Sequence, residues 1–407
     1  MTIVTDIWKQ MPGVRQPQRK FLTVLFATIL ARRGRVTGRN LSRYCDYSER
    51  TIARQFRETF DWPDFHHRVL TAALEPHSEL ISAQEASCSP KSGKQPFGLG
   101  YFCNGCANRA EPGLEVSTLA VVDVTRRCAF TLAVAQTPPG KADTRQDKRE
   151  EETRMDFYKQ QLHDQRHRLP STIRYHCVDG YFAKQKYMDE VVALNLHPLT
   201  KLRHDANCLL LYPGPHPKRR GRRRKYDGKV NFQDLSRFAA LGTLEEKPHI
   251  HLYTALVWHV SLKRQLRLVV LVNRKDPTKP RYIVLASTDV ALDGRKLVEL
   301  YAARFQIEFL FRDSKQFTGL TDCQARAATA LDFHFNAALA TLNLARAEEL
   351  QAQPDPSPHV FSRASWKQRH FNERLLEVFI DNLALDPMWV KNHPSYEKLS
   401  TYGAIAA

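Results

Sequence analysis

The segment LYAARFQIEFLFRDSK, from Leu300 to Lys315, decides how the rest of the chain is interpreted. Its apolar spacing predicts a helix, and four polar side chains recur along it: Tyr301, Arg304, Glu308 and Lys315. At about 100° per residue, these four fall within roughly 60° of one another on the helix surface. Apolar side chains occupy the other faces, and a helix that is apolar nearly all round is buried. We therefore expect a buried helix with one narrow stripe of a carboxylate, two cations and a phenol.

The net charge of the chain indicates its class of partner. The 407 residues include 61 Lys and Arg against 43 Asp and Glu, which gives a net charge of +18. A surplus of this size favours a polyanion, because each cation that meets a phosphate releases condensed counterions. Nucleic acid is the leading candidate, and an acidic membrane surface is the alternative. No apolar run is long enough to span a bilayer, and we expect a cytoplasmic protein.

Two aspartates follow apolar strands and add to the carboxylate of the helix. Asp123 ends the run LAVVD, and Asp179 ends RYHCVD. Carboxylates at strand ends lie at the edge of a sheet, where α/β folds place their chemistry. Taken alone, each aspartate is equally consistent with a strand-terminal turn. If the two aspartates converge with Glu308, the three carboxylates would need divalent cations to remain ionised.

Oxygen ligands of this kind select Mg²⁺ or Mn²⁺ over zinc. Two such ions, about 3.5 to 4 Å apart, can activate a water or a 3′-hydroxyl and stabilise the leaving oxygen of a phosphodiester. The CNGC pair, Cys103 and Cys106, has zinc-like spacing but no second pair nearby, and incidental thiols are favoured. The eight cysteines are typical of a reducing cytosol rather than of a disulfide framework.

The helix stripe resembles the Y-x2-R-x3-E-x6-K signature of the IS4-type bacterial insertion-sequence transposases, in the DDE superfamily. The contexts VVDVT and VDGYF are similar to the first and second acidic motifs of that family. The resemblance implies a ribonuclease H-like fold in which Asp123, Asp179 and Glu308 are catalytic and bind two ions. It also implies that Tyr301, Arg304 and Lys315 hold the phosphates of the transposon end.

The order of sequence patterns predicts an α/β protein with a mixed-sheet core, a β-rich insertion and helical regions at both ends. We expect an N-terminal helical DNA-binding domain at 1–84 and a linker at 85–114. The first part of the core would follow at 115–206, and a basic β-rich insertion at 207–290. The second part of the core, with the glutamate helix, would occupy 291–350, and a C-terminal helical region 351–407.

Other candidate DNA contacts lie outside the acidic motifs. Residues 40–56 resemble a helix-turn-helix whose second helix, capped by Ser48, presents Arg50, Arg54 and Arg57. The alternative is an amphipathic helix with a solvated basic face. The most basic run of the insertion includes Arg222, Arg223 and Arg224, which predict a phosphate-tracking loop or, alternatively, a solvated loop.

Two aromatic residues of the insertion are candidates for contacts with bases. In hairpin-forming relatives an aromatic residue stacks on a flipped base, and alignment of YIVLAS places Tyr282 at that position, where those relatives have Trp. Trp258 is a second candidate, but the alternation around it favours a core position.

The sequence thus favours a cut-and-paste DNA transposase. Such an enzyme would cleave the ends of an element and join their 3′-hydroxyls to target DNA, and the family implies a homodimer in the synaptic complex. Its partners would be double-stranded inverted-repeat ends and target DNA. The alternatives are a catalytically silent regulator that binds DNA and a ribonuclease H-like nuclease.

Overall fold

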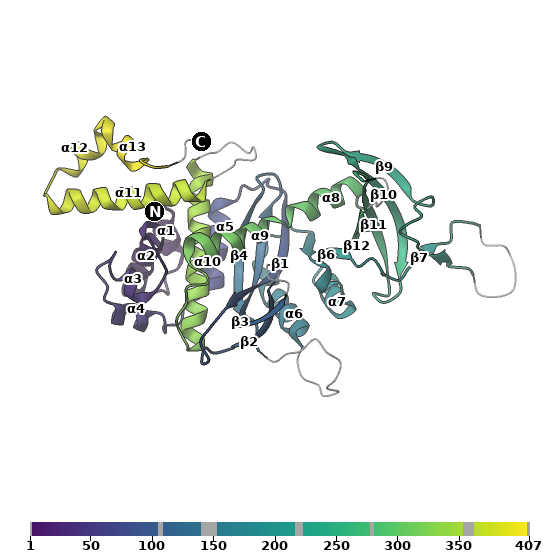
Figure 1. Cartoon of the computed structure of the whole chain (residues 1–407), viewed down its shortest axis with the longest axis horizontal. Coiled ribbons are helices and arrows are strands. Elements are labelled where there is room, and N and C mark those ends of the chain that lie inside the picture. The colour runs from purple at the N-terminus through teal and green to yellow at the C-terminus, as the bar shows by residue number, and fades with distance from the viewer. Residues whose placement is uncertain are drawn as a thin grey trace.

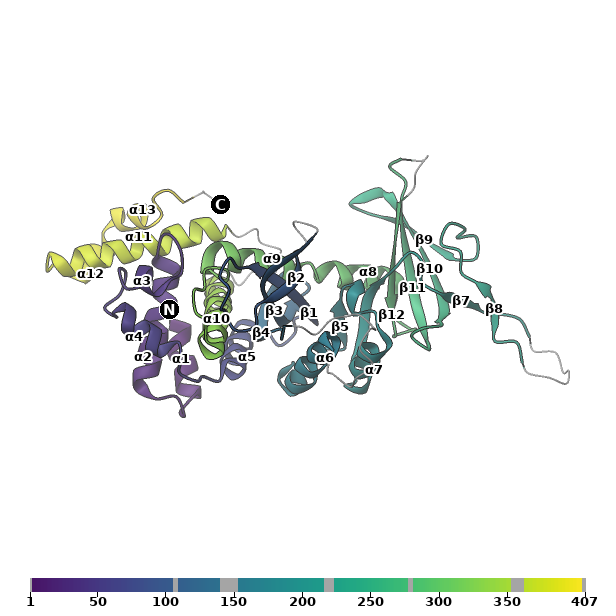
Figure 2. The same cartoon turned by 60° about the horizontal axis from the view of Figure 1, so that its bottom comes forward.

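The computed structural model describes residues 2–104, 109–139, 153–215, 223–276, 281–352 and 362–404. Helices gather at one end of the molecule, the insertion lies at the other, and a sheet stands between them (Figures 1 and 2). The N-terminal helices are α1 (Thr2–Gln10), α2 (Gln16–Ala31), α3 (Gly38–Leu41), α4 (Glu49–Gln55) and α5 (Trp62–Ala73). Among the described helices, none is both long and apolar enough to cross a bilayer.

The central sheet combines antiparallel and parallel strands. Its members are β1 (Leu80–Pro90), β2 (Gly100–Asn104), β3 (Arg109–Asp123), β4 (Cys128–Gln136), β5 (Tyr175–Val178) and β6 (His197–Leu202). β1 lies in the middle, where it pairs antiparallel with β3 and parallel with β5. β4 flanks β3, and β6 runs parallel to β5. The carboxyl ends of β1, β5 and β6 therefore share one edge of the sheet, and the carboxyl end of β3 lies at the opposite edge.

The insertion extends the same sheet. Its strands are β7 (Cys208–Leu211), β8 (Tyr226–Lys229), β9 (Ala239–Leu244), β10 (Lys247–His259), β11 (Arg264–Asn273) and β12 (Arg281–Ser287). β12 pairs antiparallel with β6, so that the central and inserted strands form one twelve-stranded sheet. The predicted fold class is confirmed: the chain has a mixed α/β core, a β-rich insertion and helices at both ends.

Helices cover both faces of the central sheet. α6 (Arg154–Gln165) and α7 (Gln185–Ala193) pack on one face, as Figure 2 shows. The other face meets α8 (Gly294–Ala303), α9 (Gln306–Asp313) and part of α10 (Ala328–Ala352). The C-terminal helices α11 (Arg363–Asn382), α12 (Pro387–Asn392) and α13 (Pro394–Ser400) extend away from the sheet beside the N-terminal helices (Figure 1).

Alternation along β1 decides which face each of its side chains meets. Ile81 and Ala83 pack in the apolar layer under α8 and α9. Gln84 points to the opposite face, where its Nε2 donates to Gln161 Oε1 of α6 at 2.9 Å. By the same alternation, the next residue, Glu85, returns to the face of α8 and α9.

The structure corrects the expected linker at residues 85–114. This range contains most of β1, all of β2 and the beginning of β3. Its Ser-, Gly- and Pro-rich composition is typical of loops, but β1 pairs with β3 from Leu80 through Pro90. The long apolar strand that follows supplies this partner, and cross-strand pairing outweighs the weak β-propensity of the segment.

Candidate active site

The predicted helix of residues 300–315 is divided at the site. α8 ends at Ala303 and α9 begins at Gln306, and Arg304 and Phe305 form a turn between them. Backbone bonds from residue i to i+3 tighten this turn, since Ile307 N donates to Arg304 O at 3.0 Å. Asp293 caps α8 as expected, because its side chain accepts from the amides of residues 295 and 296. Two helices joined by a tight turn therefore present the polar stripe.

Arg304 links two carboxylates that lie far apart in the sequence. Its guanidinium forms an ion pair with Glu85 of β1, and its Nη2 donates to Glu308 Oε1 at 2.8 Å. The Arg304 side chain is only 6% exposed. Burial acts to lower the pKa of Arg304, but Glu85, Glu308 and other negative neighbours raise it overall. The guanidinium is therefore held in its charged form between carboxylates.

Glu85 lies beside Asp179 because β1 and β5 are parallel. Ala83 pairs with Cys177, and continuing this register by two residues places Glu85 next to Asp179. Burial raises the pKa of Glu85 to about 7, and the carboxylates of Asp179 and Glu308 add to this shift, while Arg304 opposes it. Both neighbouring carboxylates therefore lie close enough to act on Glu85 electrostatically. Strand β1, the end of β5 and helix α9 thus bring Glu85, Asp179 and Glu308 to one place.

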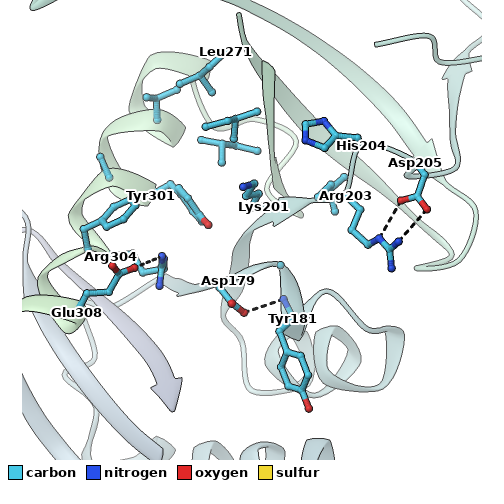
Figure 3. A pocket seen from close by; sticks show the side chains of 17 residues that line it. Asp179, Tyr181, Lys201, Arg203, His204, Asp205, Leu271, Tyr301, Arg304 and Glu308 are labelled. Atoms are coloured by element: carbon cyan, nitrogen blue, oxygen red, sulfur yellow. Dashed lines mark hydrogen bonds and ion pairs between the residues drawn. The ribbon is translucent and has the colours of Figure 1, made fainter. Parts of the chain in front are cut away.

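A cavity of about 770 Å³ opens beside this cluster (Figure 3). The helical segment carries Tyr301, Arg304, Phe305 and Glu308, and the ends of β5 and β6 carry Asp179, Lys201, Arg203, His204 and Asp205, which pairs with Arg203. Apolar residues of β11 and β12 complete the lining. Asp179 Oδ1 accepts from the amide of Tyr181 at 2.9 Å, which orients the carboxylate at the strand end. Burial raises the pKa of Tyr301 to about 12, and Arg304 opposes the shift, so the phenol remains a neutral donor near pH 7. The cavity has acidic, basic and apolar walls.

The structure does not bring Asp123 to this cluster, contrary to the expectation from sequence. Asp123 pairs with Leu80, whereas Glu85 pairs with Thr118, so five residues of β3 separate the two positions. That separation is about 17 Å along the strand. Asp123 also shares the sheet face of its partner Leu80, opposite to Glu85. Its Oδ1 accepts from the amide of Arg126 at 2.8 Å, as in the strand-terminal turn that was the alternative.

Two other predicted residues lie away from the cavity lining. Lys315 follows α9 in the π-helical turn Ser314–Thr318, and its Nζ donates to the carbonyl of Cys88 on β1 at 3.0 Å. Tyr282 packs against His204 and Phe232, with ring centroids 4.7 and 6.1 Å apart. Its neighbour on β12, Ile283, lines the cavity instead, because adjacent strand residues face opposite sides.

Phe305 is an apolar aromatic residue that lines the cavity, together with Tyr181 and Tyr301. It belongs to the turn before α9 and is 46% exposed. The guanidinium of Arg304 lies 5.1 Å from the centre of its ring. The exposed ring therefore stands one helical turn from Glu308 and beside the charged cluster.

The carboxyl end of α9 is fixed by buried charges. Asp313 pairs with Arg346 of α10 at 3.9 Å and with Arg363 of α11 at 3.6 Å. All three side chains are buried. This cluster connects the helix that carries Glu308 to the C-terminal helices, so that their packing positions the site.

The predicted helix-turn-helix corresponds to α3 and α4, which are shorter than expected. Ser48 caps α4, since its Oγ accepts from the amide of Thr51 at 3.2 Å. Arg50, Arg54 and Arg57 are all exposed, although Arg57 lies beyond the end of α4. Phe56 stacks on Phe333 of α10 at 4.7 Å. The unit is thereby attached to the core with its arginines outward.

In the basic run of the insertion, Arg223 and Arg224 precede β8 and are exposed. Arg222 lies outside the described residues, as does Cys106 of the CNGC pair.

Two residues at the site were not predicted from the sequence, and each had a weak signal. Glu85 belongs to the alternating segment LISAQEAS, which places a carboxylate on the apolar face of a strand. Lys201 lies near the end of β6 and pairs with Leu285, a residue of the cavity wall. Lys201 lies near a strand end, whereas Glu85 lies in the middle of β1, and the position of β1 beside β5 is not visible in the sequence.

The three carboxylates have the chemistry of a site for divalent cations. They are oxygen donors, and burial, with a further contribution from Asp179 and Glu308, raises the pKa of Glu85, a shift that a bound cation would oppose. Among the described residues, no three His, Cys, Asp or Glu side chains are grouped closely enough to hold an ion as they stand. Arg304 lies between Glu85 and Glu308 and supplies positive charge there. The donor set fits Mg²⁺ or Mn²⁺, provided that Arg304 moves aside.

Comparison with known proteins agrees with this architecture. No curated protein matches the chain significantly. Residues 151–344 match the transposase DDE domain family. The matched range includes Asp179, the whole insertion and Glu308, whereas β1 and Asp123 precede it. The match agrees with the ribonuclease H-like interpretation of the core and supports a DDE transposase.

Proposed function

We propose that this protein is a cytoplasmic DNA transposase that cleaves the ends of an element and joins the 3′-hydroxyls to target DNA by a cut-and-paste route. One observation carries the proposal: three carboxylates from β1, β5 and α9 meet beside a cavity with basic residues, within and next to the segment that matches the transposase DDE domain. Two-metal phosphodiester chemistry uses carboxylates that bind the ions and cationic side chains that bind the phosphates.

Glu85, Asp179 and Glu308 would hold the divalent ions, with Glu85 in the role that the sequence predicted for Asp123. Bound Mg²⁺ or Mn²⁺ would activate a water or a 3′-hydroxyl and stabilise the leaving oxygen. Glu85 suits this role because it lies beside Asp179 and on the face of α9, whereas Asp123 lies on the other face.

The cations and the phenol would bind the DNA backbone. Arg304 would exchange its contacts with Glu85 and Glu308 for a phosphate once the carboxylates ligate cations. Tyr301 would donate from its neutral hydroxyl, and Lys201 would approach the same strand from the opposite wall of the cavity. Lys315 would act indirectly, since its bond to Cys88 O joins the end of α9 to β1. Exposed arginines of α4 would contact the inverted repeats.

The transposase would act as a homodimer, and its C-terminal helices offer a surface for a second copy. Residues 363–402 contain six Lys and Arg against five Asp and Glu in a chain of net charge +18. Seven large apolar side chains of this region are more than half exposed: Leu375, Phe379, Leu383, Met388, Trp389, Leu399 and Tyr402. A nearly neutral apolar surface is unsuited to DNA and does not repel its own copy.

Light scattering tests this interface. We expect Phe379→Asp to convert a dimer with bound ends into a monomer that still binds a single end. A wild-type protein that stays monomeric with its ends at micromolar concentration would contradict the dimer.

Cleavage of the element's ends tests the enzyme. The DNA that flanks the gene should contain inverted repeats, which can be cloned as substrates. We expect Mg²⁺-dependent nicking by the wild type, and a loss of at least about 100-fold in Glu308→Gln with DNA binding retained. Glu299→Gln is the matched control, because Glu299 is an exposed carboxylate of α8 that pairs with Lys296.

Two outcomes would contradict the proposal and indicate another function. If the wild type and Glu308→Gln bind the ends equally and neither cleaves, the protein is a DNA-binding regulator. If a precut end is degraded but never joined to plasmid DNA, the protein is a nuclease. Joined products from the wild type alone would support the transposase.

A further inference from the structure

A second hollow is lined by residues at the base of the β7–β8 hairpin. Figure 2 labels these two strands at the far end of the insertion. The volume of the hollow is about 460 Å³. Three aromatic and three basic side chains line it: Tyr212, Tyr226, Trp258, Arg223, Arg224 and Lys225. Lining that combines aromatic rings with cations is typical of sites that bind single-stranded nucleic acid.

Strand pairing brings the aromatic residues together. Trp258, near the end of β10, pairs with Leu209 of β7, and Tyr226 of β8 pairs with Leu211. The rings of Tyr226 and Trp258 lie 6.0 Å apart, centre to centre. The expectation that Trp258 is a core residue is corrected, because its side chain is half-buried and forms part of the hollow wall. Trp258 lies between Gln265 of β11 and Leu209 of β7, and its side chain lines the hollow on one face of the sheet.

The cations are arranged next to the rings. The Arg224 guanidinium lies 5.0 Å from the centre of the Tyr212 ring, and its Nε donates to the carbonyl of Tyr226 at 3.1 Å. Arg224 also pairs with Asp227. Arg223 and Lys225 are exposed on either side. Positive charge therefore surrounds the aromatic surfaces, as needed to bind phosphates on both sides of a stacked base.

The hollow and the acidic cavity share one face of the sheet. Leu252 pairs with Leu271, which lines the cavity, and Trp258 lies six residues further along β10 on the same face. Six residues of a strand span about 20 Å. This length corresponds to about six stacked nucleotides of one DNA strand.

We propose that this hollow binds an unpaired segment of the DNA on which the active site acts. One base stacks on Trp258 and Tyr226, and Arg223, Arg224 and Lys225 hold the adjacent phosphates. The site would hold a strand separated from its partner near the point of cleavage. The inference rests on the proposed function for the identity of the DNA, but binding of an unpaired strand can be measured without cleavage.

Fluorescence anisotropy of the full chain with labelled oligo(dT) of about ten nucleotides tests the site. We expect Trp258→Leu to weaken binding about ten-fold or more, since stacking on one aromatic ring contributes that much. Trp258→Phe should retain most of the affinity. Tyr253→Leu is the matched control, because Tyr253 is an aromatic residue of the same strand on the opposite face. Thermal melting of each variant checks the fold.

Lys225→Gln gives a second, independent readout. It should lower the slope of log affinity against log salt by about 0.7, the value for one phosphate contact on a single strand. The proposal is overturned if folded Trp258→Leu binds oligo(dT) like the wild type. It is also overturned if Trp258→Leu weakens the binding of duplex DNA of the same length by as large a factor, because the surface would then bind DNA in general.

The two proposals fail separately. A protein that cleaves and joins its ends but binds oligo(dT) independently of Trp258 retains the proposed function and loses this site. A protein without cleavage whose oligo(dT) binding depends on Trp258 retains the site and loses the proposed function.

Discussion

Asp123 and Asp179 look alike in the sequence and occupy opposite places in the fold. Each ends a strand of buried residues, and each accepts a hydrogen bond from a backbone amide two or three residues later. Asp179 follows β5, which is parallel to β1, and reaches the edge of the sheet where the cavity opens. Asp123 ends β3, which is antiparallel to β1, and lies beside the first residue of that strand. Strand direction therefore separates the two carboxylates.

The surroundings of the two aspartates differ in the same way. Asp123 is 1% exposed and belongs to the turn between β3 and β4. Asp179 is half-buried and lines the cavity. A carboxylate after an apolar strand thus predicts a site only when the strand ends at the functional edge. Glu85 reaches that edge from the middle of β1, without any strand-end signal.

The largest expected effect tests the proposal that Glu85, and not Asp123, is a metal-binding carboxylate of the site. We predict that Glu85→Gln lowers the rate of end cleavage by at least about 100-fold, as expected for loss of a metal-binding carboxylate. Asp123→Asn keeps an oxygen acceptor for the Arg126 amide and should leave the rate within about three-fold of the wild type. Single-turnover cleavage at saturating protein measures both rates.

The matched pair makes this test decisive. Both substitutions replace a carboxylate by an amide of the same shape in a strand of the same sheet. The assignment of Glu85 is contradicted if Asp123→Asn abolishes cleavage with an unchanged melting temperature while Glu85→Gln remains active. Asp123 would then have the metal-binding role.

Much of the fold could be predicted because it depends on local patterns. The apolar runs before Asp123 and Asp179 form β3 and β5, and Asp293 and Ser48 cap their helices. The mixed α/β class, the inserted strands and the helices at both ends follow from patterns of this kind. The stripe of residues 301–308 also lies at the cavity, as helical spacing indicated.

The rest depends on pairings between distant segments. The place of β1 between β3 and β5 determines which carboxylates meet, and no local pattern of residues 80–90 reveals it. The turn at Arg304 and Phe305 likewise breaks a segment whose spacing is that of a continuous helix. Trp258 has the alternation of a core strand, but its side chain is half-buried and lines the hollow at the base of the β7–β8 hairpin.

An intermediate effect concerns the stability of the sheet face that carries Asp123. His66 of α5 is buried, and Asn343 Nδ2 lies 3.1 Å from its Nδ1 and also donates to Thr131 O of β4. Burial lowers the pKa of His66 to about 4. The unfolded chain, with a pKa of about 6.5, binds the proton first as the pH falls. The contribution of His66 to the free energy of unfolding is therefore fully present above about pH 6.5 and decreases as the pH falls towards 4.

Between pH 7 and pH 5, the titration of His66 should lower the free energy of unfolding by about 2 kcal/mol. Urea denaturation at both pH values measures it, and His66→Gln should reduce the difference by about that amount. Some dependence should remain, because burial also lowers the pKa of His176, to about 3. An unchanged difference in the variant would show that His66 does not control acid stability. The cleavage rate at saturating DNA should not follow this titration, since His66 is remote from the cavity lining.

The smallest effect should come from Arg54 on α4, where binding and chemistry can be separated. Arg54 is exposed one helical turn after Arg50, so both side chains project from the same face. If Arg54 contacts a phosphate of the inverted repeat, Arg54→Ala should weaken binding several-fold and reduce the salt slope by about 0.9. Cleavage at saturating protein should be unchanged, in contrast to Glu85→Gln.

Arg369→Ala is the control, because Arg369 is partly exposed on the nearly neutral C-terminal surface and pairs with Glu373. Equal losses in both variants would mean that net charge, rather than α4, determines the affinity, and loss of cleavage at saturation would place Arg54 in the chemistry of the site.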